Sequence, residues 1–303
     1  MSSGSGGLVL RRSVAAAGGH PQRAPLFGLF VSPALAEVNA LWPVVETAER
    51  AGIDLVTIQD HPYNPGFLDT WTLLVTIAAR TERVRVMSNV ASLPLRPPAM
   101  LAKAAATLQH VSGGRLELGL GAGAYWDGIE SLGERRLTPA QAVEALEEAL
   151  DVIRLMLGAT RDGSGHPVSF DGRWYRLNDA IPGPHIERPV PIWLGAMGPR
   201  MLRLTGARAD GWSVSRPYVG SDRLAAMQQA IDEGSAELRT AGQGIVVGSA
   251  PAWAALLADT YERLGMDTLV FAPAGGDQVE QMRRFSEDVV PRARDAMKED
   301  ATR

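Results

Sequence analysis

From Leu26 onward, short apolar runs alternate with longer segments whose apolar residues recur at helical spacing. This alternation predicts parallel strands joined by right-handed helical crossovers. Eight such units predict a closed (β/α)8 barrel of the TIM type, whereas five or six would predict an open doubly wound sheet. The predicted strands are Leu26–Phe30, Leu55–Ile58, Val84–Asn89, Leu116–Gly119, Pro191–Leu194, Trp212–Val214, Ile245–Val247 and Thr268–Phe271.

The clearest predicted helix is Pro139–Leu157. Thr138 and Gln141 fit a capping box before it, proline suits its first position, and Gly158 suits its end. Its apolar residues fall on one face at a period of 3.6. Further helices are predicted at Val44–Arg50, Ala99–His110, Leu224–Leu238 and Gln278–Ala293.

Two features interrupt the barrel pattern. After helix 4, which is Pro139–Leu157, an insertion covers Ala159–Pro189 and contains a predicted β-hairpin around Asp171-Gly172. The seventh strand, Ile245–Val247, is shortened because glycines flank its three residues. We interpret residues 1–25, rich in Ser, Gly, Ala and Pro, as a disordered tail, and residues 26–297 as the barrel.

Composition excludes several kinds of protein. The chain has no cysteine, which removes disulfides, cysteine-ligated metals and thiol nucleophiles, and its five histidines form no metal-binding pair. A net charge of -4 argues against a nucleic-acid partner. No run reaches the roughly 18 apolar residues of a membrane span. We therefore expect a soluble cytoplasmic protein without a metal site, a membrane or a nucleic-acid partner.

In a barrel, chemistry is expected where strands end. After strand two, His61 could exchange a proton near neutral pH, with Asp60 biasing its tautomer, although a histidine that binds a loop carbonyl is the commoner case. After strand three, Ser88–Ser92 fits either a bulge that presses on a flat ligand or an ordinary loop. After strand four, the glycines of Gly119–Gly123 let a backbone approach a phosphate or ring, or simply line a turn.

The fourth place follows strand five. Pro199 is suited to the first turn of a helix, so free N–H groups at Gly195–Pro199 could bind an anion. Arg200 could add charge there or lie on the surface. This segment has the best phosphate-binding chemistry of the four.

Taken in order, four segments resemble the bacterial luciferase-like family of flavin- and deazaflavin-dependent oxidoreductases. They are Val111–Leu116 leading into Gly119–Gly123, Pro191–Ala196, Gly198–Leu202 and Ala209–Trp212. The resemblance runs from about Leu26 to Arg294. It implies a barrel that binds a flavin or deazaflavin at its C-terminal mouth, and hydride transfer between that cofactor and a small organic substrate.

The resemblance also implies roles for particular residues. The family's phosphate loop falls on Gly195–Pro199, which includes Ala196, Met197 and Gly198. Its ring-supporting bulge, with a non-proline cis peptide bond, falls on Asn89-Val90. Positions that contact the cofactor in the deazaflavin branch fall on Asp60, Gly121, Gly123 and Asp127. His61 matches a histidine beside the reactive ring carbon, and Tyr63, Trp71 and Trp126 are candidate walls of the substrate pocket.

The sequence departs from relatives in that branch at Ala124, where some dehydrogenases carry a proton-donating glutamate. Three alternatives remain for function. The first is an oxidoreductase that uses coenzyme F(420). The second is an FMN-dependent monooxygenase supplied by a separate flavin reductase. The third is a non-catalytic flavin-binding barrel. The resemblance further implies a homodimer.

Overall fold

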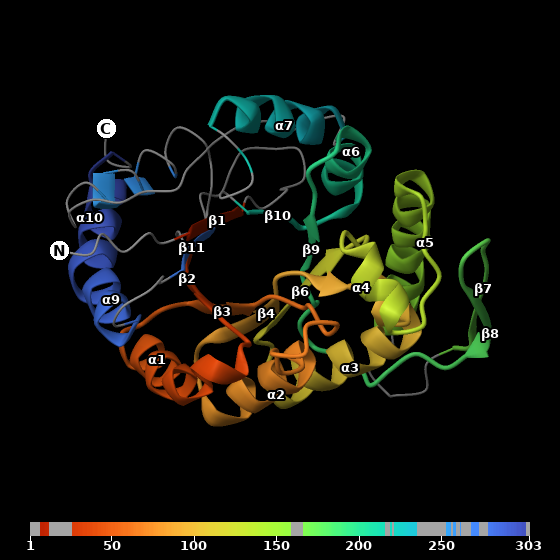
Figure 1. Ribbon diagram of the computed structural model, residues 1–303, viewed down its shortest axis with the longest axis horizontal. Coiled ribbons are helices and arrows are strands. Elements are labelled where there is room, and N and C mark those ends of the chain that lie inside the picture. Colours follow the sequence, from red (N-terminus) through yellow and green to blue (C-terminus); the bar gives the residue numbers. More distant parts are fainter. Residues whose placement is uncertain are drawn as a thin grey trace.

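The computed structural model describes residues 7–11, 26–158, 166–215, 219, 221–234, 253–255, 257, 258, 261, 268–272 and 278–300. Within these residues, eight strands pair edge to edge into a closed ring, because β4 pairs with both β3 and β6 (Figure 1). In ring order they are β2 (Leu26–Val31), β3 (Leu55–Ile58), β4 (Arg85–Ser88), β6 (Leu116–Gly121), β9 (Ile192–Gly195), β10 (Gly211–Ser215), β1 (Gly7–Arg11) and β11 (Thr268–Ala272). The expected α/β architecture is confirmed.

The position of the seventh barrel strand is filled by the N-terminal segment β1. It runs antiparallel to both neighbours, with Gly7 opposite Ala272 and Arg11 opposite Thr268. The prediction of a disordered tail over residues 1–25 is therefore wrong for residues 7–11. The predicted strand Ile245–Val247 lies outside the described residues. Without β1, the facing edges of β10 and β11 would expose unpaired backbone N–H and C=O groups. The N-terminal segment forms hydrogen bonds with both edges.

Helices follow the strands around the outside of the ring (Figure 1). They are α1 (Val38–Arg50), α2 (Thr70–Arg80), α3 (Pro98–Val111), α4 (Trp126–Ser131), α5 (Pro139–Leu157), α6 (Pro199–Arg208), α7 (Ser221–Gly234), α9 (Gln278–Arg284) and α10 (Val290–Asp300), with a π-helical turn at Phe285–Val289. Short 3-10 turns lie at Leu35–Glu37 and Leu93–Leu95. The predicted capping box of α5 is confirmed, with Thr138 and Gln141 each bonding the other's backbone N–H.

The apolar core has two parts. The larger cluster lies between the sheet and the helices, and a smaller one is formed by Leu55, Met87, Trp193 and Val270, with Phe30 packed against it. These five side chains come from β2, β3, β4, β9 and β11 and fill the barrel interior, as side-chain layers do in this fold. Glu117 of β6 is also buried, where it accepts from Trp193 Nε1 at 2.7 Å and pairs with Arg85. The interior of the barrel is therefore filled by side chains from these strands.

Arg115 belongs to one of the segments that resemble the luciferase-like family, and it connects elements at the base of the barrel by hydrogen bonds. Its guanidinium donates to the carbonyls of Ala78, Thr81 and Val84 between α2 and β4. Gly113 and Gly114 precede it with φ of +67° and +89°, a conformation that side chains rarely adopt. The Gly113–Arg115 part of this motif therefore joins elements at the base of the barrel.

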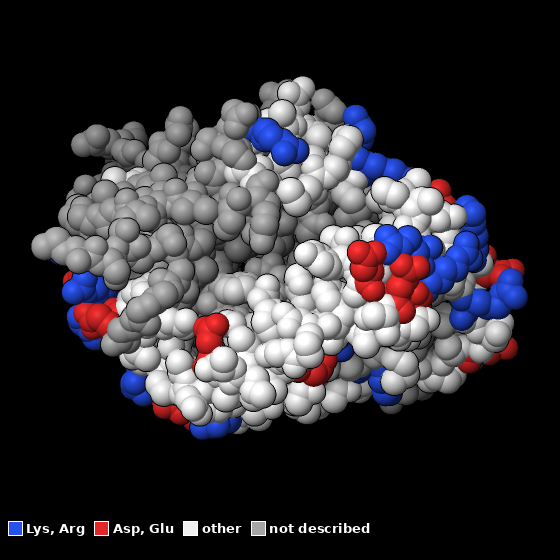
Figure 2. All heavy atoms as spheres, viewed as in Figure 1, with Lys and Arg blue, Asp and Glu red and all other residues white. Residues whose placement is uncertain are grey.

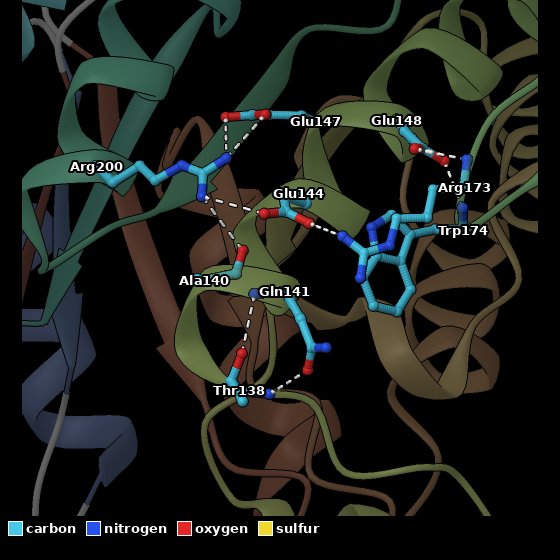
Figure 3. A network of polar contacts seen from close by, with 9 residues as sticks. All are labelled: Thr138, Ala140, Gln141, Glu144, Glu147, Glu148, Arg173, Trp174 and Arg200. Carbon is cyan, nitrogen blue, oxygen red and sulfur yellow. Dashed lines mark hydrogen bonds and ion pairs between the residues drawn. The ribbon is translucent and has the colours of Figure 1, made fainter.

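The insertion forms the predicted hairpin from β7 (Val168–Asp171) and β8 (Arg176–Ala180). Its tip is fixed to α5 by Glu148, whose carboxylate accepts from the backbone N–H groups of Arg173, Trp174 and Tyr175 at 2.8–3.1 Å. Figure 3 shows Glu148 beside Arg173 and Trp174. A Cβ at Gly172 would lie 2.3 Å from Glu148, so this approach requires glycine. Together the contacts place the hairpin tip beside the α4–α5 loop.

On the face drawn in Figure 2, acidic and basic side chains are interspersed over the α4–α5 side, and neither sign forms a continuous patch. Among the described residues, no helix combines the length and apolarity that crossing a bilayer requires. The described residues also contain no group of three or more His, Asp or Glu side chains arranged to hold a metal ion.

Candidate active site at the carboxyl ends of the strands

The loop after β3 contributes Asp60, whose carboxylate is already occupied by protein donors. Arg96 approaches it with Nε 2.7 Å from Oδ2 and Nη2 2.7 Å from Oδ1, and the Ser92 N–H donates to Oδ2 at 2.9 Å. Only 1% of the Asp60 side chain is exposed. Arg96 also contacts Asp69, the N-cap of α2. Asp60 therefore ties the loop after β3 to the loop after β4 rather than presenting a free carboxylate.

His61 is half-buried next to Asp60 and lies among aromatic rings. Its Nδ1 is 3.3 Å from the hydroxyl of Tyr63, and Phe67 contacts its ring edge-on with centroids 6.4 Å apart. Burial lowers the pKa of His61, and the charge of Asp60 opposes this in part. His61 is therefore held toward its neutral form, which can both donate and accept a proton.

After β4 the chain makes a cis peptide bond between Asn89 and Val90, as the family resemblance implied. Asn89 makes three hydrogen bonds to two other strands of the barrel. Its backbone N–H donates to the carbonyl of Ile58 at 2.7 Å, its Oδ1 accepts from Ser213 at 2.6 Å, and its Nδ2 lies 3.4 Å from the hydroxyl of Thr57. The bulge is thus tied to β3 and β10.

Glycines surround the bulge because its neighbours need the space. A Cβ at Gly121 or Gly195 would lie 2.8 or 2.9 Å from a methyl group of Val90, and one at Gly119 would lie 2.0 Å from the carbonyl oxygen of Ser88. The structure therefore brings together four of the predicted residues, namely Asn89, Val90, Gly121 and Gly195. They form a wall at the mouth end of β4, β6 and β9 in which the Val90 side chain packs against the two glycines.

Farther along the β6 loop, the predicted residues diverge. Gly123 has φ of +94°, and a Cβ there would lie 2.9 Å from Pro94 and 3.2 Å from Trp126. Asp127 opens α4 with 93% of its side chain exposed, and it pairs with Arg136. The structure therefore places Gly123 in the packed part of the loop and Asp127 on the outer surface.

The β9 loop leads straight into the N-terminus of α6. Gly198 is the N-cap residue, and among the described residues no side chain caps the helix and no atom lies within 4 Å of a Cβ placed at Gly198. Ala196 is buried and its carbonyl accepts from Trp212 Nε1 at 2.9 Å, whereas Met197 is 45% exposed. The first N–H groups of α6 are therefore left without a side-chain cap from the described residues, at the positive end of the helix dipole.

Arg200 does not join this loop. Figure 3 shows its guanidinium directed at α5, where it lies 3.3 Å from Glu147 and 3.7 Å from Glu144 and donates to the carbonyl of Ala140 at 3.4 Å. Of the two interpretations of Arg200 from sequence, the structure favours the surface residue. Any anion at the N-terminus of α6 would be bound by backbone N–H groups.

Sequence reasoning missed three residues that build this site, Thr57, Arg96 and Ser213, and it gave the hydroxyl of Tyr63 no role of its own. Thr57 and Ser213 could have been found from period 2, because each faces the barrel interior and alternates with residues that pack against the helices, namely Val56 and Ile58 in β3 and Trp212 and Val214 in β10. Arg96 carries no such signal, since it lies 36 positions from Asp60.

A groove of about 420 Å³ opens between the hairpin tip and the loops on this side of the barrel. Trp174 and Tyr175 line it from the insertion, and Pro94, which packs beside Gly123, lines it from the β4 side. Burial and the nearby Glu134 and Glu148 raise the pKa of Tyr175 to about 12, so its hydroxyl stays protonated at neutral pH. The insertion therefore reaches the neighbourhood of the mouth.

Comparison with known proteins gives a consistent family. An F(420)-dependent glucose-6-phosphate dehydrogenase from Amycolatopsis mediterranei is 33% identical over 171 residues, which cover 54% of this chain and 50% of that protein. A phthiodiolone/phenolphthiodiolone dimycocerosates ketoreductase from Mycobacterium kansasii is 34% identical over 225 residues, covering 70% and 58%. The chain thus spans between half and three-fifths of the length of these curated relatives.

Among solved structures, a monooxygenase from Streptomyces bottropensis superposes with a TM-score of 0.68 at 17% identity, covering 88% of this chain and 99% of that one. This likeness concerns the fold. The model of the luciferase-like monooxygenase family matches residues 13–256. The chain belongs to the luciferase-like monooxygenase family, whose members include oxidoreductases that use deazaflavin and flavin cofactors.

Proposed function

We propose that this chain is an oxidoreductase that binds coenzyme F(420) at the carboxyl ends of its barrel strands and transfers hydride to or from a small organic substrate. The observation that carries the proposal is the pairing of the uncapped α6 N-terminus with the glycine wall around Val90. A helix N-terminus of this kind favours a phosphate, and a wall in which Val90 packs against glycines accommodates a flat ring. The residues present therefore fit a phosphorylated tricyclic cofactor.

The roles of individual residues follow from their positions. The backbone N–H groups of Met197 and Gly198 would hold the phosphate, Pro199, which has no N–H, would set the first turn of α6, and Gly195 and Ala196 lead into that turn. Val90, Gly121 and Gly195 would support the ring, and Asn89 would hold the bulge in place through Ser213 and Thr57. When bound, the deazaflavin supplies hydride chemistry. His61, neutral and half-buried, would exchange the accompanying proton.

Asp60 would act indirectly. Because Arg96 and Ser92 occupy both carboxylate oxygens, its contribution would be to hold the backbone on either side of His61 and to moderate the pKa of that imidazole. Gly123 would shape the loop, and the exposed Asp127 would contact only a cofactor tail that leaves the barrel. The groove at Pro94, Trp174 and Tyr175 would select the substrate.

The second candidate is an FMN-dependent monooxygenase that receives reduced flavin from a separate reductase, and the likeness to the Streptomyces monooxygenase favours it. Titrating the purified protein with F(420) and with FMN, followed by fluorescence quenching, tests both. We expect tighter binding of F(420). Preferential binding of FMN would support the monooxygenase, and failure of both to bind would contradict the proposal. We further propose a homodimer, which light scattering would detect.

Gly198 offers a test of the phosphate site. Gly198→Asp should leave the fold intact, because aspartate is a favourable N-cap residue and its Cβ has free space. The same carboxylate would repel a bound phosphate. We expect at least a roughly tenfold loss of F(420) affinity, equivalent to about 1.4 kcal/mol. The matched control, Gly198→Asn, has the same shape without the charge and should lose much less. Equal affinities of the two variants would place the phosphate elsewhere.

A further inference from the structure

The hydroxyl of Tyr63 contacts a ring nitrogen of His61, so Tyr63 does more than line a pocket. Its hydroxyl lies 3.3 Å from His61 Nδ1, so one of the two ring nitrogens already has a protein partner. The remaining nitrogen, Nε2, is then the atom available for proton exchange. Which nitrogen carries the proton in the neutral ring depends on whether Tyr63 donates or accepts.

Elementary acid–base chemistry decides between the two arrangements. A phenol is a better hydrogen-bond donor than acceptor, and the unprotonated nitrogen of a neutral imidazole is a strong acceptor. Burial and the nearby Asp60 and Tyr125 raise the pKa of Tyr63, so the phenol keeps its proton at neutral pH. Burial lowers the pKa of His61, so the imidazole is held toward its neutral form. Tyr63 Oη–H therefore donates to Nδ1, and the ring proton resides on Nε2.

The position of the Tyr63 ring is set by packing on two sides. It stacks on Tyr125 with centroids 5.9 Å apart and planes inclined by 19°. It also lies over Gly128 of α4, where an added Cβ would come within 2.5 Å of the phenol ring. Because these contacts involve the ring and not the hydroxyl, removal of the hydroxyl should leave the ring in place.

We propose that Tyr63 is a positioning residue that fixes the tautomer of His61, leaving Nε2–H directed to the reaction. The inference rests on the proposed function, in which His61 exchanges a proton beside the cofactor. It assigns to Tyr63 a role distinct from contact with substrate. Tyr63 itself takes up and releases no proton.

The charged and titratable groups around His61 set its response to pH. They are Asp60 on the same loop, Tyr63 two residues on, and Tyr125 at the start of α4, with Arg96 paired to Asp60. A donor bonded to the neutral form of histidine disfavours the charged form. Tyr63→Phe should therefore raise the pKa of His61, whereas a purely packing role for Tyr63 would leave it unchanged.

The test is nitrogen NMR of the full chain labelled with 15N-histidine, with His61 assigned from the His61→Gln variant. At a pH above the His61 pKa, we expect Nδ1 of the wild type to resonate as an unprotonated nitrogen and Nε2 as a protonated one. In Tyr63→Phe the ratio of the tautomers should fall roughly 5- to 10-fold, the amount that one hydrogen bond supports. The apparent pKa should rise by about 0.7 to 1 unit.

Tyr125→Phe is the matched control, because it alters the stacked neighbour without touching His61 Nδ1, and it should keep the wild-type tautomer. A protonated Nδ1 in the wild type, or an unchanged ratio in Tyr63→Phe, overturns the proposal. These measurements need no cofactor, so their outcome is separate from that of the F(420) titration. Adding F(420) to the labelled wild type should then shift Nε2 more than Nδ1, and an equal or opposite response overturns the assignment of Nε2.

Discussion

The pair formed by Asp60 and Arg96 allows a quantitative prediction about stability. Arg96→Met removes a two-point contact from a carboxylate whose side chain is only 1% exposed and leaves it with the single N–H of Ser92. Breaking a buried ion pair from one side costs about 3–5 kcal/mol, because a charge stays buried without its partner. The second partner of Arg96, Asp69, is 44% exposed and adds little.

Asp60→Asn is expected to cost less than Arg96→Met. In that variant Arg96 keeps its ion pair with Asp69, and its side chain is 18% exposed to solvent. Its charge therefore stays partly compensated. We expect about 1–3 kcal/mol for Asp60→Asn. The double variant should be less destabilised than the sum of the single variants, because each residue acts through the other.

Urea unfolding, followed by circular dichroism and compared at equal m-value, measures these differences. Arg176→Met is the matched control. It breaks the Arg176–Asp171 pair of the hairpin, whose side chains are 64% and 78% exposed, and should cost below about 1 kcal/mol. If Arg96→Met were no more destabilising than Arg176→Met, the buried pair would not hold the two mouth loops together.

Three further predictions concern the barrel and its base. Deleting residues 1–12 removes β1 and its pairing with β10 and β11. At about 0.5–1.5 kcal/mol per net backbone hydrogen bond, thermal unfolding should show a loss of stability of roughly 3 kcal/mol or more. An unchanged Tm would show that β1 does not close the barrel. Gly119→Ala should destabilise by about 1–3 kcal/mol or more because its Cβ would lie 2.0 Å from the Ser88 carbonyl oxygen, whereas Gly66→Ala, with its nearest neighbour at 3.5 Å, should be nearly neutral in the same melt. Although burial opposes ionisation of Glu49, three backbone N–H donors hold its pKa below the usual 4.5, so its contribution to stability is present above that pH and is lost as pH falls through the folded-state pKa. The stability lost in Glu49→Gln, measured by urea unfolding, should therefore be largest at neutral pH and smaller in acid. A loss that is independent of pH would contradict this.

Much of the mouth was predictable because its signals are local. The glycines at positions 121 and 195 stand out in apolar strands, and the structure shows Val90 filling the space that their side chains would take. Pro199 indicated the start of α6 correctly. The cis bond before Val90 came from the family resemblance rather than from any property of the two residues.

The family motifs themselves divide into two kinds once their places are known. Arg115 binds backbone carbonyls between α2 and β4, and Asp210 accepts from the N–H of Ile192 at 2.9 Å, so two of the four motifs hold the barrel together at its base. The first of these motifs continues into Gly119–Gly123, which lies with Gly198–Leu202 at the mouth. Resemblance by sequence therefore mixes residues that maintain the fold with residues that line the mouth.

Most of the strands and helices can be predicted from the sequence alone, because apolar periodicity and capping are read over a few neighbouring residues, but the strand β1 was not among them. The hydrogen-bond and ion-pair partners of polar groups cannot be predicted from neighbouring residues in this way. Arg200 pairs with α5 rather than with the phosphate loop, Arg96 meets Asp60 across 36 positions, and Gly7–Arg11 pairs with strands more than 200 residues away. Each of these choices depends on which unsatisfied charge or backbone edge lies within reach after the chain has folded, and that distance exists only in three dimensions.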